Sequence, residues 1–168
     1  MDLLPLFLKL EGRRVVVVGN GAVVAGKLDA LVRAGADVRV VDGDAFQPGD
    51  LDGAWLVVSG ASSAINARVA AAAESRRVFV NAVDDPPNAS AYLGGVVRRA
   101  GVTIAISTSG DAPALAGLLR EGIDALLPAD LDRWSACARD MRHAWKTTGV
   151  PMEERRPQLV EALKRLYP

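Results

Sequence analysis

The order of apolar and polar residues in the first half of the chain predicts strands that alternate with helices. Residues 13–18 include four consecutive valines and lead into Gly19, which is typical of a strand buried on both faces. Residues 21–34 carry apolar side chains at helical spacing, and Gly35 stands where a helix commonly ends. A second strand over 37–41 completes a βαβ unit.

The same alternation continues up to residue 87. Further strands are expected over 55–59 and 78–83, with an alanine-rich helix over 64–75 between them. The link over 42–53 is rich in Asp, Gly and Pro, and it is too short and too interrupted for a full crossover helix. Because strands and helices alternate, we predict an α/β fold with a Rossmann-like parallel sheet.

After Pro87 the pattern changes to a small α+β region followed by a helical C-terminal tail. Two apolar runs separated by residues 98–101 predict an antiparallel pair of strands. The elements expected here are strands over 91–97 and 102–107 and helices over 113–126, 131–147 and 153–166. Trp134 and Trp145 share one predicted helix and indicate a packing face, whose partner is either the body of the protein or another subunit.

Composition and charge limit the class of protein. Half of the residues are hydrophobic, and 20 basic residues balance 20 acidic ones, so we expect no nucleic-acid partner. Cys137 is the one cysteine, which excludes an internal disulfide and favours a reducing, cytoplasmic setting. One histidine and one cysteine do not suffice for a structural zinc site, and we predict no metal site.

The N-terminal residues also bear on location. They are apolar, but no basic segment precedes them and Pro5 interrupts them, so we expect no signal peptide. No apolar run approaches the ~20 residues that a membrane span needs, and we expect no membrane partner.

The turn between the first strand and the first helix is the first candidate for a ligand site. Gly19-Asn20-Gly21 permits a tight turn, so that a pyrophosphate could lie against backbone N–H groups at the helix N-terminus. The third position of the dinucleotide-binding pattern is Val24 instead of glycine or alanine. We expect the following residues to bind a dinucleotide: Gly19, Asn20, Gly21, Ala22 and Val23. A glycine turn that binds nothing is the alternative.

Asp42 follows the second strand and bears on the choice of cofactor. It lies 23 residues after Gly19. An acid at this place accepts hydrogen bonds from a ribose 2′-OH and repels a 2′-phosphate, so it favours NAD over NADP. A plain Asp-Gly turn with Gly43 is the alternative.

Two further segments are candidates for the chemistry. Asp84 ends the fourth strand, where a carboxylate could accept a proton in the ligand crevice, although Asp-Asp-Pro-Pro is also a good turn. Thr108 and Ser109 lie between a strand and a helix, where hydroxyls and free N–H groups could bind an anion. Ordinary capping of that helix by Ser109 or Asp111 is the alternative.

Several motifs, spread in order over nearly the whole chain, match a known family. They are residues 4–21, 74–84, 104–110, 118–121, 127–128 and 154–156. With these motifs the chain resembles the precorrin-2 dehydrogenase/sirohydrochlorin ferrochelatase family, which is also the N-terminal module of sirohaem synthases. The resemblance implies an NAD-binding Rossmann domain (1–88), a dimerisation region (89–127) and a helical C-terminal domain (128–168).

The same resemblance implies a reaction and a set of site residues. The expected reaction is the NAD-dependent oxidation of precorrin-2 to sirohydrochlorin by a homodimer, with iron insertion, a lyase reaction, in some members. The family's catalytic aspartate falls on Asp84 and its substrate-proximal hydroxyl on Thr108. Since precorrin-2 carries many carboxylates, polar and basic side chains should line its pocket. The residues we expect to bind substrate are Asn81, Thr108, Ser109 and Arg98.

The extent of the activity is open on two points: whether iron is inserted, and whether the chain is an enzyme at all. The chain has one histidine, one cysteine and no acidic cluster near the site beyond Asp84 and Asp85, so we expect any iron insertion to be the weaker or absent activity. A non-catalytic NAD- or tetrapyrrole-binding Rossmann module remains the other possibility.

Overall fold

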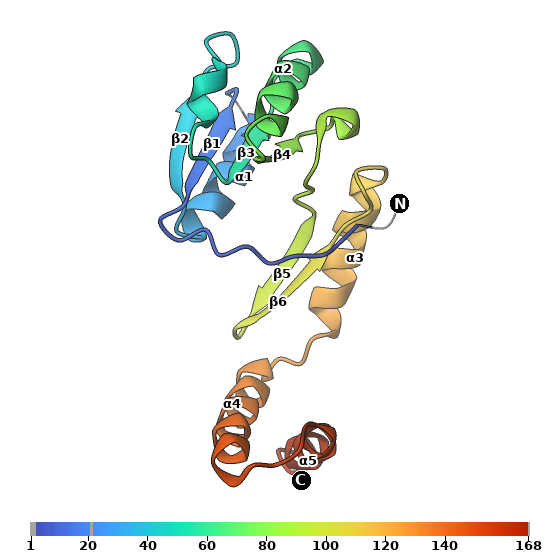
Figure 1. Cartoon of the computed structure of the whole chain (residues 1–168). Coiled ribbons are helices and arrows are strands. Elements are labelled where there is room, and N and C mark those ends of the chain that lie inside the picture. Colours follow the sequence, from blue (N-terminus) through green and yellow to red (C-terminus); the bar gives the residue numbers. More distant parts are fainter. Residues whose placement is uncertain (1–2, 21, 168) are drawn as a thin grey trace. The chain divides into compact units, whose positions relative to one another are not determined.

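The computed structural model describes residues 3–20 and 22–167, and the chain divides into two compact units (Figure 1). The first unit comprises Met1–Gly94 and Ser107–Pro113, and the second comprises Gly95–Ile106 and Ala114–Pro168. The predicted segment 89–127 is therefore shared between the two units. Within the described residues, no helix has both the length and the apolar character needed to cross a membrane.

The first unit is built on a four-stranded, fully parallel sheet in the order β2-β1-β3-β4. Its strands are β1 (Arg14–Val18), β2 (Asp37–Val41), β3 (Leu56–Ser59) and β4 (Phe79–Ala82). Val18 at the end of β1 pairs with Val41 of β2 on one side and with Ser59 of β3 on the other. The carboxyl ends of the strands thus share one edge, and the predicted α/β, Rossmann-like fold is confirmed.

Helices cover both faces of this sheet (Figure 1). The helix α1 (Ala22–Arg33) links β1 to β2, and α2 (Ser63–Glu74) links β3 to β4. Between β2 and β3 there is only a 3-10 turn, η1 (Pro48–Leu51), as the Asp, Gly and Pro content of this link predicted. A second 3-10 turn, η2 (Pro86–Asn88), follows β4.

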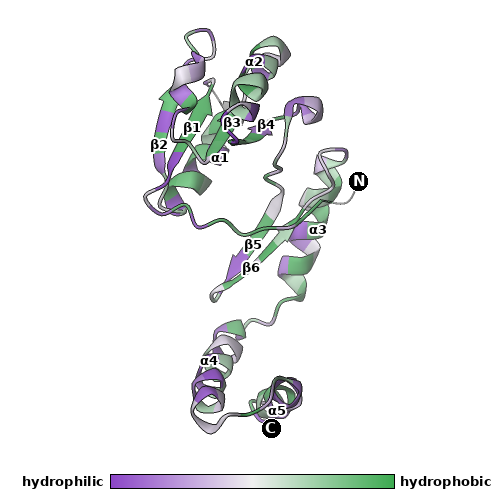
Figure 2. Cartoon of the chain, viewed as in Figure 1, coloured by the Kyte–Doolittle hydropathy of each residue, from purple (hydrophilic) through white to green (hydrophobic). Residues whose placement is uncertain are grey.

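The four valines of β1 hold the two layers of helices to the sheet. Because side chains alternate along a strand, Val16 and Val18 join the core beneath α2, and Val15 and Val17 join the core beneath α1. All four side chains are fully buried, which stabilises the fold by about 1.5–3 kcal/mol per residue. Figure 2 shows the contrast with the edge strand β2, where polar residues interrupt the apolar ones.

The second unit consists of a β-hairpin and three helices. The hairpin pairs β5 (Gly95–Arg99) with β6 (Val102–Ile106) in antiparallel register. The helices are α3 (Pro113–Leu126), α4 (Leu131–Thr148) and α5 (Met152–Lys164). The predicted helical C-terminal region is therefore confirmed.

The hairpin differs from the prediction at both ends of its first strand. The strand begins at Gly95 instead of residue 91, because the backbone N–H groups of Ser90 and Ala91 donate to the Val80 carbonyl of β4 (2.9 and 2.8 Å). Arg98 and Arg99, expected in the turn, lie in the strand. The turn is only Ala100 and Gly101, whose φ angles of 50° and 80° suit a two-residue type I′ connection.

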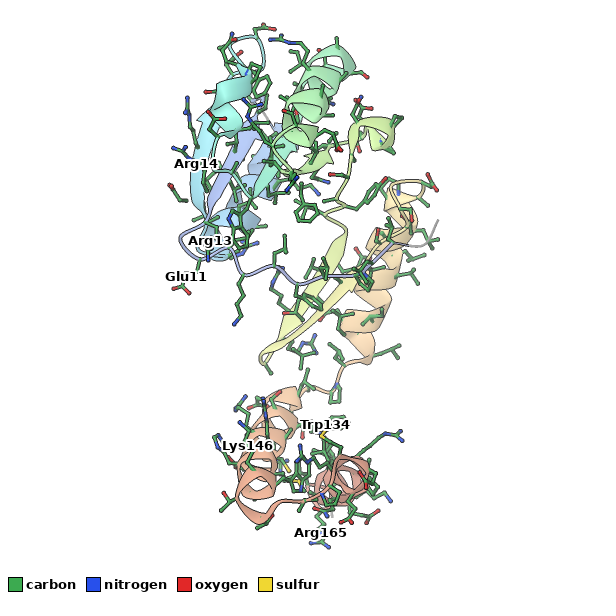
Figure 3. All side chains as sticks on the ribbon, viewed as in Figure 1. Glu11, Arg13, Arg14, Trp134, Lys146 and Arg165 are labelled. Atoms are coloured by element: carbon green, nitrogen blue, oxygen red, sulfur yellow. The ribbon has the colours of Figure 1, made fainter. Side chains whose placement is uncertain are left out.

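The two tryptophans of α4 pack within the helical tail. The Trp134 indole N–H donates to the Tyr167 hydroxyl (2.6 Å), and the Trp145 indole N–H donates to the Gln158 side-chain oxygen (2.7 Å). Figure 3 labels Trp134 at the side of α4 that faces α5. The partner of the predicted packing face therefore lies within the same unit.

Candidate active site

The loops that follow β1 and β3 meet at the carboxyl edge of the sheet. Gly19 has φ 105°, and a Cβ atom there would lie 2.9 Å from the Gly60 carbonyl oxygen, so only glycine allows this approach. From β1 the chain passes to β2 on one side, while β3 lies on the other side. Such a switch point is where open α/β sheets bind their ligands.

Asn20 and Asp42 come together beside this point. The Asn20 amide donates to Asp42 Oδ2 (3.3 Å), and the Asp44 backbone N–H donates to Asp42 Oδ1 (3.0 Å). Both side chains of the pair are exposed. Asp42 directly follows β2, as the sequence indicated, and its role in nucleotide binding and its preference for NAD stay predictions.

The start of α1 directly follows the loop. The helix begins at Ala22, so its first backbone N–H groups point toward the carboxyl edge, where an anion is favoured. Val24 is buried in the core between α1 and the sheet. Gly21 and the side chains of Ala22 and Val23 lie outside the described residues, and their contacts with a ligand stay a prediction. A tight glycine turn and a helix N-terminus are the groups that commonly hold the pyrophosphate of a dinucleotide.

Asp84 lies at the same edge, beyond the end of β4. The Val83 N–H donates to the Ser59 carbonyl (2.8 Å) and so extends the pairing of β4 with β3 by one residue. Asp84 itself has φ 54°, a left-handed conformation that is uncommon outside glycine. Its side chain is exposed, and no residue in the described part of the chain forms a hydrogen bond with it. It is therefore a free carboxylate at the carboxyl edge of the sheet.

The next residue, Asp85, has the opposite environment. Its Oδ2 accepts hydrogen bonds from the side-chain amides of Asn66 and Asn88, each at 3.0 Å. The hydrogen bond from Asn88, followed by that from Asn66, holds the pKa of Asp85 below its ordinary value. The Asn66 oxygen in turn accepts the Ser59 hydroxyl at 2.7 Å, and both of these residues are buried. Asp85 is thus part of a polar network.

The loop 107–113 belongs to the first unit and lies against the turn after β4. Gly110 has φ 86°, and a Cβ atom there would lie 3.1 Å from both Pro86 Cγ and Tyr92 Cε1. Thr108 Oγ1 accepts the Ala112 N–H (3.3 Å), so Thr108, and not Ser109 or Asp111, satisfies a backbone donor before α3. Its hydroxyl hydrogen remains available to a ligand.

The other two residues predicted to bind substrate have different surroundings. Asn81 is buried, and its amide donates to the Ala91 carbonyl (3.0 Å), while its Oδ1 is a buried atom without a partner in the described part of the chain. Arg98 is exposed on β5 and belongs to the second unit. Asp84, Asn81 and the 107–113 loop therefore belong to the first unit, and Arg98 does not.

Sequence reasoning missed the residues that hold this edge in shape. Ser59, Asn66 and Asn88 form the network around Asp85, and Lys27 Nζ donates to the Leu93 carbonyl (2.9 Å). The available signal was a serine and an asparagine at positions that the strand and helix patterns mark as buried. Among the described residues, no three His, Cys, Asp or Glu side chains gather as a metal site would require.

A family model described as "Putative NAD(P)-binding" matches residues 6–95, which is more than half of the chain. The chain belongs to this NAD(P)-binding family. The matched segment contains the glycine loop, Asp42 and Asp84, and it ends before the 107–113 loop. The predicted nucleotide cofactor is therefore confirmed at the level of NAD(P), while the residues that bind it stay a prediction.

The chain is also similar to siroheme synthases. It is 39% identical to Siroheme synthase 1 of Serratia proteamaculans and 42% identical to Siroheme synthase 1 of Yersinia enterocolitica, in each case over 93% of this chain. The chain spans 37% of the length of each of these relatives.

Among solved structures, one described as "SirC, precorrin-2 dehydrogenase" is similar in fold. It aligns with 95% of this chain and 88% of its own, with a TM-score of 0.68 and 18% sequence identity. This likeness agrees with the family membership at the level of fold.

Proposed function

We propose that this chain is an NAD-dependent precorrin-2 dehydrogenase, which oxidises precorrin-2 to sirohydrochlorin. The observation that carries the proposal is Asp84, a free and exposed carboxylate at the carboxyl edge of an NAD(P)-binding sheet. The names of the similar proteins support the substrate, since they are siroheme synthases and a precorrin-2 dehydrogenase.

The proposed reaction removes one hydride and one proton from precorrin-2 and leaves a new double bond in the macrocycle. NAD, when bound, supplies the acceptor for the hydride. Asp84 accepts the proton as the double bond forms and releases it to water, because its side chain is exposed. Asp85 is less suited to this role, since two amides already donate to its carboxylate.

The cofactor is proposed to be NAD and not NADP. Asp42 projects at the end of β2, and its two oxygens accept one hydrogen bond each from Asn20 and Asp44. A carboxylate oxygen has a further lone pair for a ribose hydroxyl, whereas a 2′-phosphate would meet a like charge.

The substrate is proposed to lie near the 107–113 loop. Thr108 retains a hydroxyl hydrogen for a substrate carboxylate, and Ser109 is exposed with φ 57° beside Gly110. Asn81 Oδ1 has no partner in the described part of the chain, but it is buried, so a contact with the substrate would require it to become accessible. Arg98 belongs to the second unit, and its contact with the substrate stays a sequence-based prediction. We place this activity in a cytoplasmic homodimer.

The test of the proposed base is the variant Asp84→Asn. We expect dehydrogenase turnover to fall by about 10²–10⁴-fold because the proton acceptor is lost, with NAD affinity unchanged because the cofactor loop lies elsewhere. The measurement follows sirohydrochlorin formation from precorrin-2 with NAD, together with calorimetric NAD binding. Asp37→Asn is a matched control, since Asp37 is exposed at the opposite end of the sheet, at the start of β2.

The same experiment separates the alternatives. Full activity of Asp84→Asn contradicts the base assignment, and NAD binding without any turnover in the wild type indicates a non-catalytic module. Sirohydrochlorin offered with Co²⁺ or Fe²⁺ measures metal insertion, which we expect to be slower than dehydrogenation. Metal insertion faster than dehydrogenation would contradict this order.

A further inference from the structure

The backbone of Asp84 needs support from its surroundings. A left-handed conformation is unfavourable for most residues with a Cβ atom, and Asp84 adopts it with φ 54°, although aspartate tolerates it better than most residues do. Such strain persists where neighbouring contacts over-determine the conformation, and it gathers at functional sites. The contacts on either side of Asp84 therefore decide where its carboxylate lies.

One residue, Ser59 at the end of β3, anchors Asp84 from both sides. On the N-terminal side, the Ser59 carbonyl accepts the Val83 N–H at 2.8 Å. On the C-terminal side, the Ser59 hydroxyl donates to Asn66 (2.7 Å), and the Asn66 amide donates to the Asp85 carboxylate (3.0 Å). Asp84 thus lies between two attachments to the same strand end.

The turn after Asp84 is held by the same carboxylate. Asn88 donates to Asp85 from its side chain (3.0 Å) and, through its backbone N–H, to the Asp85 carbonyl (3.1 Å). The buried part of the network is fully oriented, because the Asn66 oxygen accepts from Ser59 and its nitrogen must then donate to Asp85. Buried hydrogen-bonded chains of this kind rigidify the residues they join.

We propose that Asp85, held by Asn66 and Asn88, is a positioning residue that sets the place of the Asp84 carboxylate for proton transfer. Asp85 does not touch the substrate in this proposal, and it acts only through Asp84. The proposal rests on the proposed function of Asp84 as the base. In this proposal, the hydrogen bonds of the buried Ser59 and Asn66 fix Asp85, and with it the Asp84 carboxylate, relative to the end of β3.

The test combines kinetics with amide hydrogen exchange in Asp85→Ala, Asp85→Asn and the control Asp50→Ala. Asp50 is matched because its carboxylate also holds a 3-10 turn of the first unit, accepting the Gln47 N–H (2.8 Å) and the Arg39 guanidinium (2.6 Å). We expect Asp85→Ala to lower kcat about tenfold to hundredfold, since small displacements of a reacting group have effects of this size. Asp85→Asn keeps an oxygen that both amides can reach, and it should stay within about threefold of the wild type.

A double-substitution cycle distinguishes positioning from a merely structural effect. If Asp85 acts through Asp84, then Asp85→Ala lowers kcat in the wild-type background and has no further effect in Asp84→Asn. An equal loss in both backgrounds, or an equal loss from Asp50→Ala, overturns the proposal.

Hydrogen exchange tests the same claim without turnover. We expect faster exchange over residues 83–89 in Asp85→Ala and unchanged exchange there in Asp50→Ala. If the wild type forms no sirohydrochlorin, the proposed function fails, and the exchange result alone then decides whether Asp85 holds Asp84. Unchanged exchange over residues 83–89 in Asp85→Ala overturns the positioning role.

Discussion

At the scale of single residues, two of the candidate site residues have an unusual backbone conformation. Asp84 and Ser109 both have positive φ; Asp84 precedes Asp85, whose side chain accepts a hydrogen bond from Asn88, and Ser109 precedes Gly110, whose φ is also positive. The sequence indicated that an acid ends the fourth strand, because strand ends are readable from the apolar pattern. It did not indicate which of Asp84 and Asp85 is free, since this depends on Asn66, 18 residues before Asp84 in the chain and brought close only by folding.

The nucleotide preference is a prediction at this scale. Asp42→Ala should weaken NAD binding about tenfold to hundredfold, because a hydrogen bond to a charged group contributes about 1.5–3 kcal/mol. NADP binding should weaken less or improve, since the repulsion of the 2′-phosphate is removed. Calorimetry with both nucleotides measures this, with Asp37→Asn as the control. Equal or tighter binding of NADP by the wild type would show that the assignment of Asp42 is wrong.

The lowered pKa of Asp85 predicts that the stability of the fold depends on pH. Its pKa is lowered in the folded state by the amides of Asn88 and Asn66, so its contribution is fully present above the unfolded pKa of about 3.9 and is lost as the pH falls through the lower folded value. The melting temperature of the wild type should therefore exceed that of Asp85→Asn from neutral pH down to about pH 5, and the difference should shrink below about pH 4. A difference that grows on acidification would contradict the network.

At the scale of elements, the sequence predicted the order and type of every helix and strand described in the fold, but not all their ends. Periodicity places a buried strand such as β1 well, because all its side chains meet the two cores. It places β5 poorly, because the preceding residues Ser90 and Ala91 hydrogen-bond to β4 in a contact that no local pattern records. Arg99 belongs to β5 because it pairs with Val102 of β6, and its guanidinium donates to Asp124 and to the Leu127 carbonyl near the end of α3.

The hairpin turn carries a prediction about folding stability. Ala100 occupies the first turn position with φ 50°, where asparagine before glycine is strongly preferred. Ala100→Asn should raise the free energy of unfolding by about 0.5–1 kcal/mol, because it relieves part of the left-handed penalty. Urea denaturation of the whole chain measures the change. In the control Ala71→Asn, on the exposed side of α2, the same exchange should destabilise by about 0.5 kcal/mol, since asparagine is a poorer helix former.

At the scale of the whole molecule, α3 presents an apolar stripe. Its exposed leucines follow helical spacing: Leu115, Leu118, Leu119 and Leu126. Figure 2 shows the apolar colour along this helix. Beside it, the sheet of β5 and β6 has only two strands, so both of its outer edges lack a partner strand in the described part of the chain. These features support the predicted homodimer through residues 89–127.

The molar mass of the protein in solution tests the predicted dimer. The wild type should be a dimer at micromolar concentration in light scattering, and Leu118→Arg together with Leu119→Arg should produce monomers, because charges would have to be buried in an apolar interface. Lys146→Glu, an exposed change on α4 labelled in Figure 3, is the control and should leave the mass unchanged. A monomeric wild type would show that this assembly is wrong.

The chain passes from one unit to the other three times, after Gly94, after Ile106 and after Pro113. A gene truncated after codon 94 would encode the whole parallel sheet yet omit Thr108 and Ser109, although both belong to the same unit. Isolating the first unit therefore calls for an internal deletion, in which a short linker replaces the β5–β6 hairpin and joins residue 94 to residue 107, together with a stop after residue 113. By the same logic, a protease that nicks the Ala100-Gly101 turn would leave each unit with pieces from both fragments, and the nicked protein could stay assembled without an intact chain.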